Sequence, residues 1–153
     1  MRDQLKTNNK ILAGLIAIFI CFHDLAKAEE IVFIVNAENP IKEMRNQDVV
    51  DIFLKKKREW ADASGIHFID RKDGSVERHI FLTQYIGRSD RDIELYWIGQ
   101  KLYSGNAAPM QVLTDQNAEK MVSTFKGGMS YVLSTYVLGK GVKKIMIQGN
   151  TSP

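Results

Sequence analysis

The sequence has few of the residues that build thiol, disulfide or metal sites. It has a single cysteine, Cys21, and its three histidines show neither HxxH nor HExxH spacing. The G-x-S-x-G, Walker and G-x-G-x-x-G motifs are also absent. A Ser75, His79 and Asp73 set can be written, but it lacks the nucleophile turn of the hydrolases. We therefore expect a protein that is not an enzyme and carries neither a metal nor a cofactor.

Long hydrophobic runs are absent as well. The N-terminal run Ile11–Phe22 has 12 residues, whereas a membrane-spanning helix needs about 20. A cationic start precedes this run, and Ala26 and Ala28 follow it at the small positions of a signal-peptidase site. The sequence thus predicts a signal peptide over residues 1–28, cleaved after Ala28, with a retained anchor as the alternative. Residues 29–153 would form one exported domain, periplasmic or secreted, without cysteine and without stable membrane insertion.

Excess charge of one sign is small. The formal net charge is +3, and residues 1–28 hold four basic and two acidic residues, so they account for +2 of it. A nearly neutral remainder gives no reason to expect a nucleic-acid partner. The densest basic run, Lys55–Arg58, falls at the end of an expected helix, where cations interact favourably with the helix dipole. We interpret it as a solvated helix end, with an acidic partner or anionic lipid as the alternative.

Strands and helices alternate along the rest of the chain. Short apolar runs predict strands at 31–35, 66–70, 129–133 and 143–149. Apolar residues at helical spacing predict helices at 46–54, 75–86, 90–103 and after residue 114. This order is typical of an α/β fold with a mixed, mostly parallel sheet, in which ligands bind beyond the carboxyl ends of the strands.

Local signals place the helix ends. We expect N-caps at Asn46, Ser75, Ser89 and Thr114. The pair Gly127-Gly128 is expected to stop the last helix, because glycine tolerates the left-handed conformation. Two apolar stripes are expected on the later helices, and both tryptophans are expected to pack in the core. These residues are Leu95, Ile98 and Leu102; Ala118, Met121, Val122 and Phe125; and Trp60 and Trp97.

The stretch HFIDRKDGSVERHIFL, residues 67–82, joins a strand to a helix at such a carboxyl edge. The guanidinium of Arg71 suits phosphate, sulfate or carboxylate. The helix that Ser75 begins presents free N–H groups and a partial positive charge. Ordinary capping is the alternative interpretation. The expected ligand-binding residues are Arg71, Asp73, Gly74, Ser75, Val76, Glu77 and Arg78, with Asn36 at the end of the first strand and Tyr131 on a later strand as further candidates.

Four segments resemble the phosphate-binding proteins of ABC transporters. RKDGS resembles their R-x-D-G-S-G-T turn, and VVDIFLKKKREWADAS resembles IF-x-G-K-x-x-x-W-x-D-G. YWIGQKLYSGNAAP is similar to W…F-x-G-x-x-x-P, and VSTFKGGMSYV to V…T-P-G-A-I-G-Y-V. The segments lie in order within residues 31–132. The resemblance implies a type 2 periplasmic-binding-protein fold in a small, largely single-lobed form, and it matches Arg71, Asp73 and Ser75 to positions of the anion site.

The resemblance also implies a function. We expect non-catalytic, extracytoplasmic capture or sensing of a small anion, phosphate or similar, with a membrane permease or a sensor protein as partner. Two residues depart from the pattern, since Val76 replaces a glycine and Glu77 replaces a threonine. Glu77 removes a hydroxyl donor and adds a negative charge beside the expected anion. The alternative is therefore an envelope protein-interaction module on a binding-protein scaffold that has lost its ligand.

Overall fold

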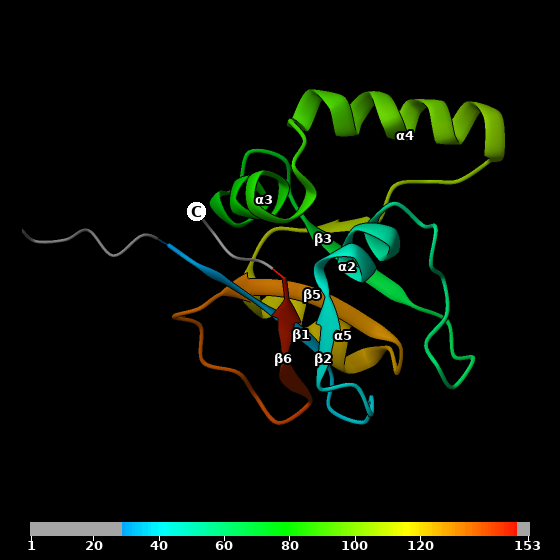
Figure 1. The fold of residues 1–153 in the computed structure, drawn as a ribbon. Helices are drawn as coiled ribbons and strands as arrows, with labels where there is room; N and C mark the ends of the chain where they lie inside the picture. The colour runs from blue at the N-terminus through cyan, green and yellow to red at the C-terminus, as the bar shows by residue number, and fades with distance from the viewer. Residues whose placement is uncertain (1–28, 150–153) are drawn as a thin grey trace, which may run out of the picture.

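One six-stranded sheet organises residues 29–149, the part of the chain that the computed structural model describes (Figure 1). Its spatial order is β2-β6-β1-β5-β3-β4. β1 runs antiparallel to β5 and β6, whereas β2–β6, β3–β5 and β3–β4 are parallel pairs. The predicted mixed, mostly parallel sheet is confirmed, and two short edge strands, β2 and β4, are added to it. The strands are β1 Ile31–Asn36, β2 Glu43–Arg45, β3 His67–Arg71, β4 Met110–Val112, β5 Gly128–Leu133 and β6 Val142–Gln148.

Helices cover both faces of this sheet. They are α2 Asn46–Phe53, α3 Val76–Ile80, the π-helix η1 Phe81–Ile86, α4 Asp90–Ser104 and α5 Asp115–Thr124. The two hydrophobic clusters place α5 on one face and α2, η1 and α4 on the other. The predicted signal peptide, its cleavage after Ala28 and the alternative anchor all lie outside the described residues. No helix within residues 29–149 has the length and apolar character to cross a membrane.

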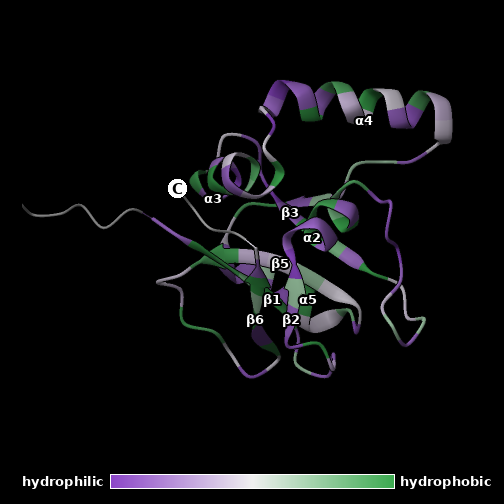
Figure 2. Ribbon diagram, viewed as in Figure 1, coloured by the Kyte–Doolittle hydropathy of each residue, from purple (hydrophilic) through white to green (hydrophobic). Residues whose placement is uncertain are grey.

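The strand β1 belongs to both halves of the core. Phe33 and Val35 point into the larger cluster, and Ile34 points into the smaller one, as the period of two in a strand requires. In the larger cluster the rings of Phe81 and Tyr131 stack with their centroids 4.4 Å apart. Figure 2 shows apolar residues along β1, whereas α4 alternates between polar and apolar residues over its whole length. The sheet, rather than any helix, therefore joins the two halves of the core.

Three of the four expected N-caps are confirmed. Ser75, Ser89 and Thr114 each accept a hydrogen bond from the backbone amide three residues further on. The expectation for Asn46 is wrong, because Arg45 holds the N-cap position without a side-chain cap. Asn46 instead donates from Nδ2 to the carbonyl oxygen of Tyr85 at 3.1 Å, across a gap of 39 residues. A long-range acceptor thus replaces the local one that capping would have used.

The segment 75–86 is helical as predicted, but its winding changes at Phe81. α3 continues directly into η1, and Phe81 and Ile80 are buried in the larger cluster. Val76, the first residue of α3, is half exposed. Gly87 then ends the segment in the left-handed conformation, with φ of 68°.

The glycines after α5 act by close approach and not by left-handed backbone. Phe125 ends the helix in an extended conformation, and neither Gly127 nor Gly128 has positive φ. A Cβ on Gly127 would lie 1.8 Å from the carbonyl oxygen of Gly65, and one on Gly128 would lie 2.6 Å from that of Val122. The predicted helix end is correct, but its physical reason is different.

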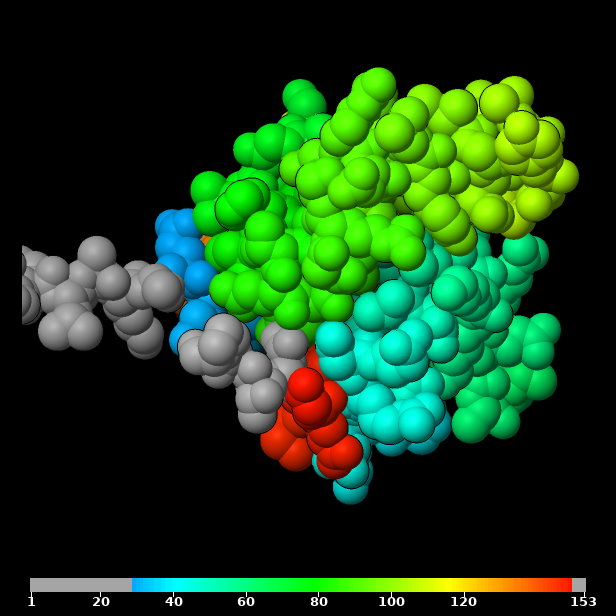
Figure 3. Space-filling view, turned by 45° about the horizontal axis from the view of Figure 1, so that its top comes forward, coloured from blue at the N-terminus to red at the C-terminus, as the bar shows by residue number. Residues whose placement is uncertain are grey.

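The helix α4 stands apart from the rest. Figure 3 shows it as a ridge along one margin of the molecule. Ile93 and Trp97 are its buried residues, and Trp97 lies in the core as expected. The stripe of Leu95, Ile98 and Leu102 is exposed instead. The buried side of α4 thus contains only two of its 15 residues, so few side chains pack this helix against the core.

Candidate functional site

The predicted turn begins with Arg71, the last residue of β3. Its side chain is 1% exposed, and its guanidinium already binds two carboxylates. Nη1 donates to Asp115 Oδ1 at 2.6 Å, and Nη2 donates to Glu77 Oε1 at 3.0 Å and to the carbonyl oxygen of Leu113 at 3.3 Å. Parallel pairing of β4 with β3 sets Arg71 beside Val112, so α5 begins next to it. The fork is thus at the expected edge, but it is occupied by the chain's own oxygens.

The pair of carboxylates around Arg71 is not balanced by one guanidinium. Burial raises the pKa of Asp115, Arg71 opposes that shift, and the charge of Glu77 adds to it. In addition, Arg71 Nε is buried and has no hydrogen-bond partner among the described residues. One donor of the fork therefore remains unused, and one of its two internal acceptors is destabilised in its charged form.

The helix start at Ser75 is a cap. Gly74 has φ of 80°, a value that glycine adopts without strain, and it turns the chain towards α3. Ser75 Oγ accepts from the backbone amide of Arg78 at 3.2 Å, and the Ser75 amide donates to the carbonyl oxygen of Lys72 at 3.1 Å. The hydroxyl oxygen that was expected beside an anion thus holds the first turn of α3.

The second arginine of the turn, Arg78, is also enclosed. Its side chain is 5% exposed, and its guanidinium is ion-paired with three aspartates: with Asp70 through Nη1, and with Asp73 and Asp90 through Nε, both at 3.1 Å. Asp73 further accepts from Gln111 Nε2 at 2.8 Å, which joins it to β4. Asp73 therefore joins the turn to β4 and pairs with Arg78.

Tyr131 completes this network from the neighbouring strand. Its hydroxyl donates to Asp70 Oδ1 at 2.5 Å, and the same oxygen accepts from the Arg71 backbone amide at 2.8 Å. Tyr131 is fully buried, and burial raises its pKa. The residue thus lies beside the predicted turn, as a packed tyrosine that fixes the carboxylate of Asp70.

Asn36 does not belong to this group. β1 is antiparallel to β5, and β5 is parallel to β3, so the end of β1 lies at the edge where β3 begins. The Asn36 side chain donates to the carbonyl oxygens of Val122, Ser123 and Phe125 at the end of α5, at 3.1 to 3.2 Å. The expectation that it lines the same edge as Arg71 is therefore corrected by the direction of β1.

A groove of about 990 Å³ runs between the turn and α4. Asp70, Asp73, Arg78, Asp90 and Trp97 line it. The two arginines of the turn thus face five carboxylates, since Glu77 and Asp115 flank Arg71 and the three aspartates flank Arg78. An anion approaching this edge meets like charges unless one of them is displaced or protonated.

Three of these carboxylates were not found from the sequence. Asp70 is the penultimate residue of β3, Asp90 follows a cap, and Asp115 stands in the first turn of α5, where acidic residues are common for local reasons. Only the pairing of β4 with β3 brings Asp115 to Arg71, 44 residues away in the chain. Among residues 29–149 no group of three or more histidine, cysteine or acidic side chains is arranged to hold a metal ion.

Comparison with known proteins identifies the architecture. The family described as a PBP superfamily domain matches residues 21–151. No curated protein matches the chain in sequence.

Solved structures give the same result. One is the structure, with bound phosphate, of a Clostridium perfringens protein assigned to the phosphate ABC transporter substrate-binding proteins. It aligns with a TM-score of 0.63 and 19% sequence identity, over 79% of this chain and 46% of that one. An ABC-type phosphate transport receptor from Vibrio cholerae aligns with a TM-score of 0.62 and 16% identity, over 79% of this chain and 47% of that one. PstS from Borrelia burgdorferi aligns with a TM-score of 0.63 and 12% identity, over 82% of this chain and 49% of that one. The chain thus spans about half the length of each, and at these identities the likeness is one of fold.

Proposed function

The chain belongs to the PBP superfamily domain family, and from that premise we propose that it is a non-catalytic, extracytoplasmic solute-binding domain that captures or senses a small oxyanion. Phosphate or a similar ion is the proposed ligand class, and a membrane permease or sensor is the proposed partner. The domain would comprise residues 29–153 after removal of the signal peptide 1–28.

The observation that supports this proposal is the Arg71 fork. It binds one oxygen from each of two carboxylates, at 2.6 and 3.0 Å, beside the N-terminus of α3. Carboxylates are oxyanions, so the fork has the geometry that phosphate or sulfate would use. Glu77 and Asp115 would then act as internal competitors, and an external anion would bind by replacing one of them. Such a site responds to its ligand by releasing a carboxylate, which suits sensing as well as capture.

The test is a calorimetric titration of the purified protein with sulfate, phosphate and acetate. Glu77→Thr introduces the hydroxyl that the R-x-D-G-S-G-T motif has at this position, and it removes a negative charge beside Arg71. We expect this variant to bind sulfate about tenfold more tightly than the unmodified protein, because one charge-assisted interaction is worth about 1.5 to 3 kcal/mol. Arg71→Met should abolish the response. No heat and no thermal shift in Glu77→Thr with any of these anions at millimolar concentration would reject the proposal.

The comparisons give no support to the alternative, a docking module that has lost its ligand. One observation favours it as a second candidate: Leu95, Ile98 and Leu102 leave an apolar stripe of α4 exposed. Replacing these three residues by serine would distinguish the two functions. A docking module would lose its partner on this change, whereas anion binding at Arg71 would continue.

A further inference from the structure

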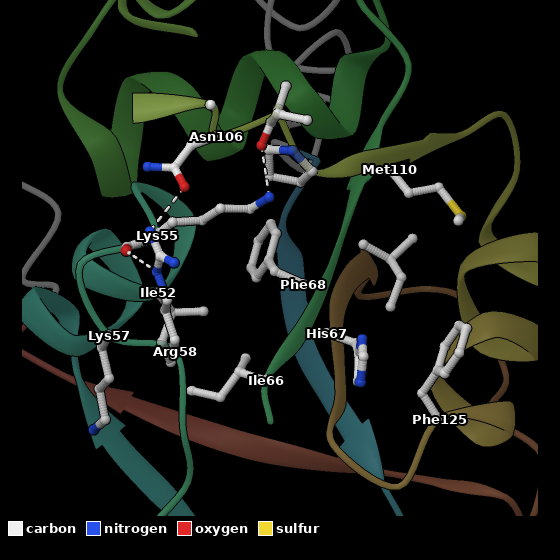
Figure 4. Close-up of a pocket in the computed structure, with 15 residues that line it drawn as sticks. Ile52, Lys55, Lys57, Arg58, Ile66, His67, Phe68, Asn106, Met110 and Phe125 are labelled. Carbon is white, nitrogen blue, oxygen red and sulfur yellow. Dashed lines mark hydrogen bonds between the residues drawn. The ribbon is translucent and has the colours of Figure 1, made fainter. Parts of the chain in front are cut away.

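A second hollow, of about 440 Å³, lies at the opposite end of β3 from Arg71 (Figure 4). The segment after α2, the first half of β3 and the connection from α4 to β4 form its walls. It shares Ala107, Ala108 and Pro109 with the groove between the Arg71 turn and α4, so this short segment separates the two cavities. Its volume is within the range of small-molecule sites, about 300 to 1,000 Å³.

The charges in this hollow are of one sign. Lys55, Lys57, Arg58 and His67 line it, and none of its lining residues is acidic. Lys57 is paired with Asp48 at 3.1 Å. Lys55 and Arg58 have no ion-pair partner within the part of the chain that the structure describes. Two cations without a carboxylate partner thus face one cavity, in contrast to the excess of carboxylates at the Arg71 turn, although Lys55 Nζ also lies 5.8 Å from the centroid of the Trp97 ring.

Both cations are held in place by neutral oxygens. Lys55 Nζ donates to the carbonyl oxygen of Ala107 at 2.6 Å. Arg58 donates from Nη2 to Asn106 Oδ1 at 2.9 Å and from Nε to the carbonyl oxygen of Lys55 at 3.0 Å. These bonds fix the two side chains at the wall and leave N–H donors for another acceptor.

The electrostatics of Lys55 also favour an anion here. Burial, followed by the charge of Arg58, lowers the pKa of Lys55. An anion bound between Lys55 and Arg58 would remove their mutual repulsion.

The rest of the lining is apolar. Figure 4 shows Ile66 and Phe68 between the cationic end and a wall made by His67, Phe125 and Met110. The rings of His67 and Phe125 stack with centroids 4.8 Å apart. A bare phosphate or sulfate would leave this apolar surface in water, whereas an organic anion would cover it.

We propose that this hollow binds a small carboxylate with an apolar body, in the size class of an aromatic acid. The carboxylate lies between Lys55 Nζ and the Arg58 guanidinium, and the apolar body lies against Ile66 and Phe68. This site is separate from the Arg71 turn and does not depend on it.

The test is a titration of the ¹⁵N-labelled protein with phenylacetate, followed by amide chemical shifts. We expect shifts at Ile66–Ile69 and at Asn106–Met110. Lys55→Met and Arg58→Gln should each weaken binding about tenfold or more, because each removes a charge-assisted hydrogen bond. Lys56→Met is the matched control, since this neighbouring lysine is exposed and does not line the hollow; it should change the affinity less than about twofold, as expected of an exposed charge.

A neutral probe completes the test. Phenylacetamide has the same shape as phenylacetate but no charge, so it should bind at least about tenfold more weakly because it cannot form the charge-assisted hydrogen bonds. Equal binding of phenylacetate and phenylacetamide, or unchanged affinity in the Lys55→Met, Arg58→Gln double variant, would overturn the proposal. Shifts confined to the Arg71 turn would also overturn it. If sulfate does not bind in the titration described above while phenylacetate does bind, the proposed function would be rejected and this separate site would be supported.

Discussion

At the scale of single residues, the molecule is organised by where its two buried arginines find their counter-charges. Arg71 is enclosed by Glu77 and Asp115, and Arg78 by three aspartates. Buried ion pairs are costly to desolvate, and breaking one leaves an uncompensated charge. The side chain that makes Arg71 attractive as an anion receptor is therefore also a structural element of the fold.

Replacing Arg71 tests this structural role. In Arg71→Met, Glu77 and Asp115 remain 13% and 14% exposed without a cation. We expect a loss of about 3 to 5 kcal/mol in the free energy of unfolding, the usual cost of removing one partner of a buried pair. Urea denaturation measures it. Arg91→Met is the control, because the Arg91–Glu94 pair is largely exposed and should contribute no more than about 1 kcal/mol. Equal stability of the two variants would contradict the role assigned to Arg71.

The raised pKa of Asp115 predicts how anion binding depends on pH. As the pH falls through that raised pKa, Asp115 takes up a proton at a higher pH than an exposed aspartate does, and it becomes neutral. Arg71 then has one competitor less, so the affinity for sulfate should increase as the pH falls through the pKa of Asp115. Sulfate is the suitable probe because its own charge does not change over this range.

Asp115→Asn provides the check on this pH dependence. This variant should bind sulfate more tightly at neutral pH and should lose most of the increase on acidification, as measured by calorimetry. Asp62→Asn serves as the control, since Asp62 is exposed and bonds to Ser64 far from the turn. A pH profile that is the same in Asp115→Asn as in the unmodified protein would show that Asp115 is not the group that titrates.

At the scale of elements, the sequence was informative wherever the cause is local. Ser75, Ser89 and Thr114 cap their helices by bonds to amides three residues away, and such bonds can be predicted from adjacent letters. The predicted N-cap at Asn46 was wrong because the side chain of Asn46 donates to the Tyr85 carbonyl oxygen, 39 residues away in the chain. At Gly127 the predicted helix end was correct, but its cause is also distant in the chain, since the atom that a Cβ would meet belongs to Gly65.

The candidate site was predictable to the same extent. The strand end and the helix start of 67–82 follow from local patterns, and the structure brings Arg71, Asp73 and Ser75 together in one turn. The carboxylate of Asp115 arrives through sheet topology, and the position of Asn36 follows from the antiparallel direction of β1. A helical period likewise predicted a stripe on α4, but it did not indicate which side of that helix would face the core.

The helix α4 packs against the core through few side chains, and this packing can be tested. Trp97 is 8% exposed, while Leu102 is 74% exposed. We expect Trp97→Ala to detach α4, so that its amide hydrogen exchange approaches that of an unprotected helix, while the strands stay protected. Leu102→Ala should leave the exchange of α4 unchanged. Equal protection of α4 in both variants would mean that something other than Trp97 holds the helix.

At the scale of the whole molecule, the two hydrophobic clusters cannot act as separate units. They lie on opposite faces of one sheet, and β1 contributes Phe33 to one and Ile34 to the other. Loss of either cluster removes support from the same strand. Residues 29–149 therefore form one cooperative body, in keeping with a chain that spans about half the length of the structures it resembles.

A single body predicts that binding occurs without closure. Both proposed sites are contained within residues 29–149, at opposite ends of β3, and neither lies between two lobes. A ligand at either site moves side chains, whereas a hinge between lobes would change the overall dimensions. We expect small-angle scattering to give a radius of gyration of about 14 Å for a protein of residues 29–153, the value for a compact chain of this length. Saturating sulfate or phenylacetate should leave that value unchanged within error. A contraction of about 1 Å or more would mean that parts of the domain close around the ligand, and the single-body description would then be wrong.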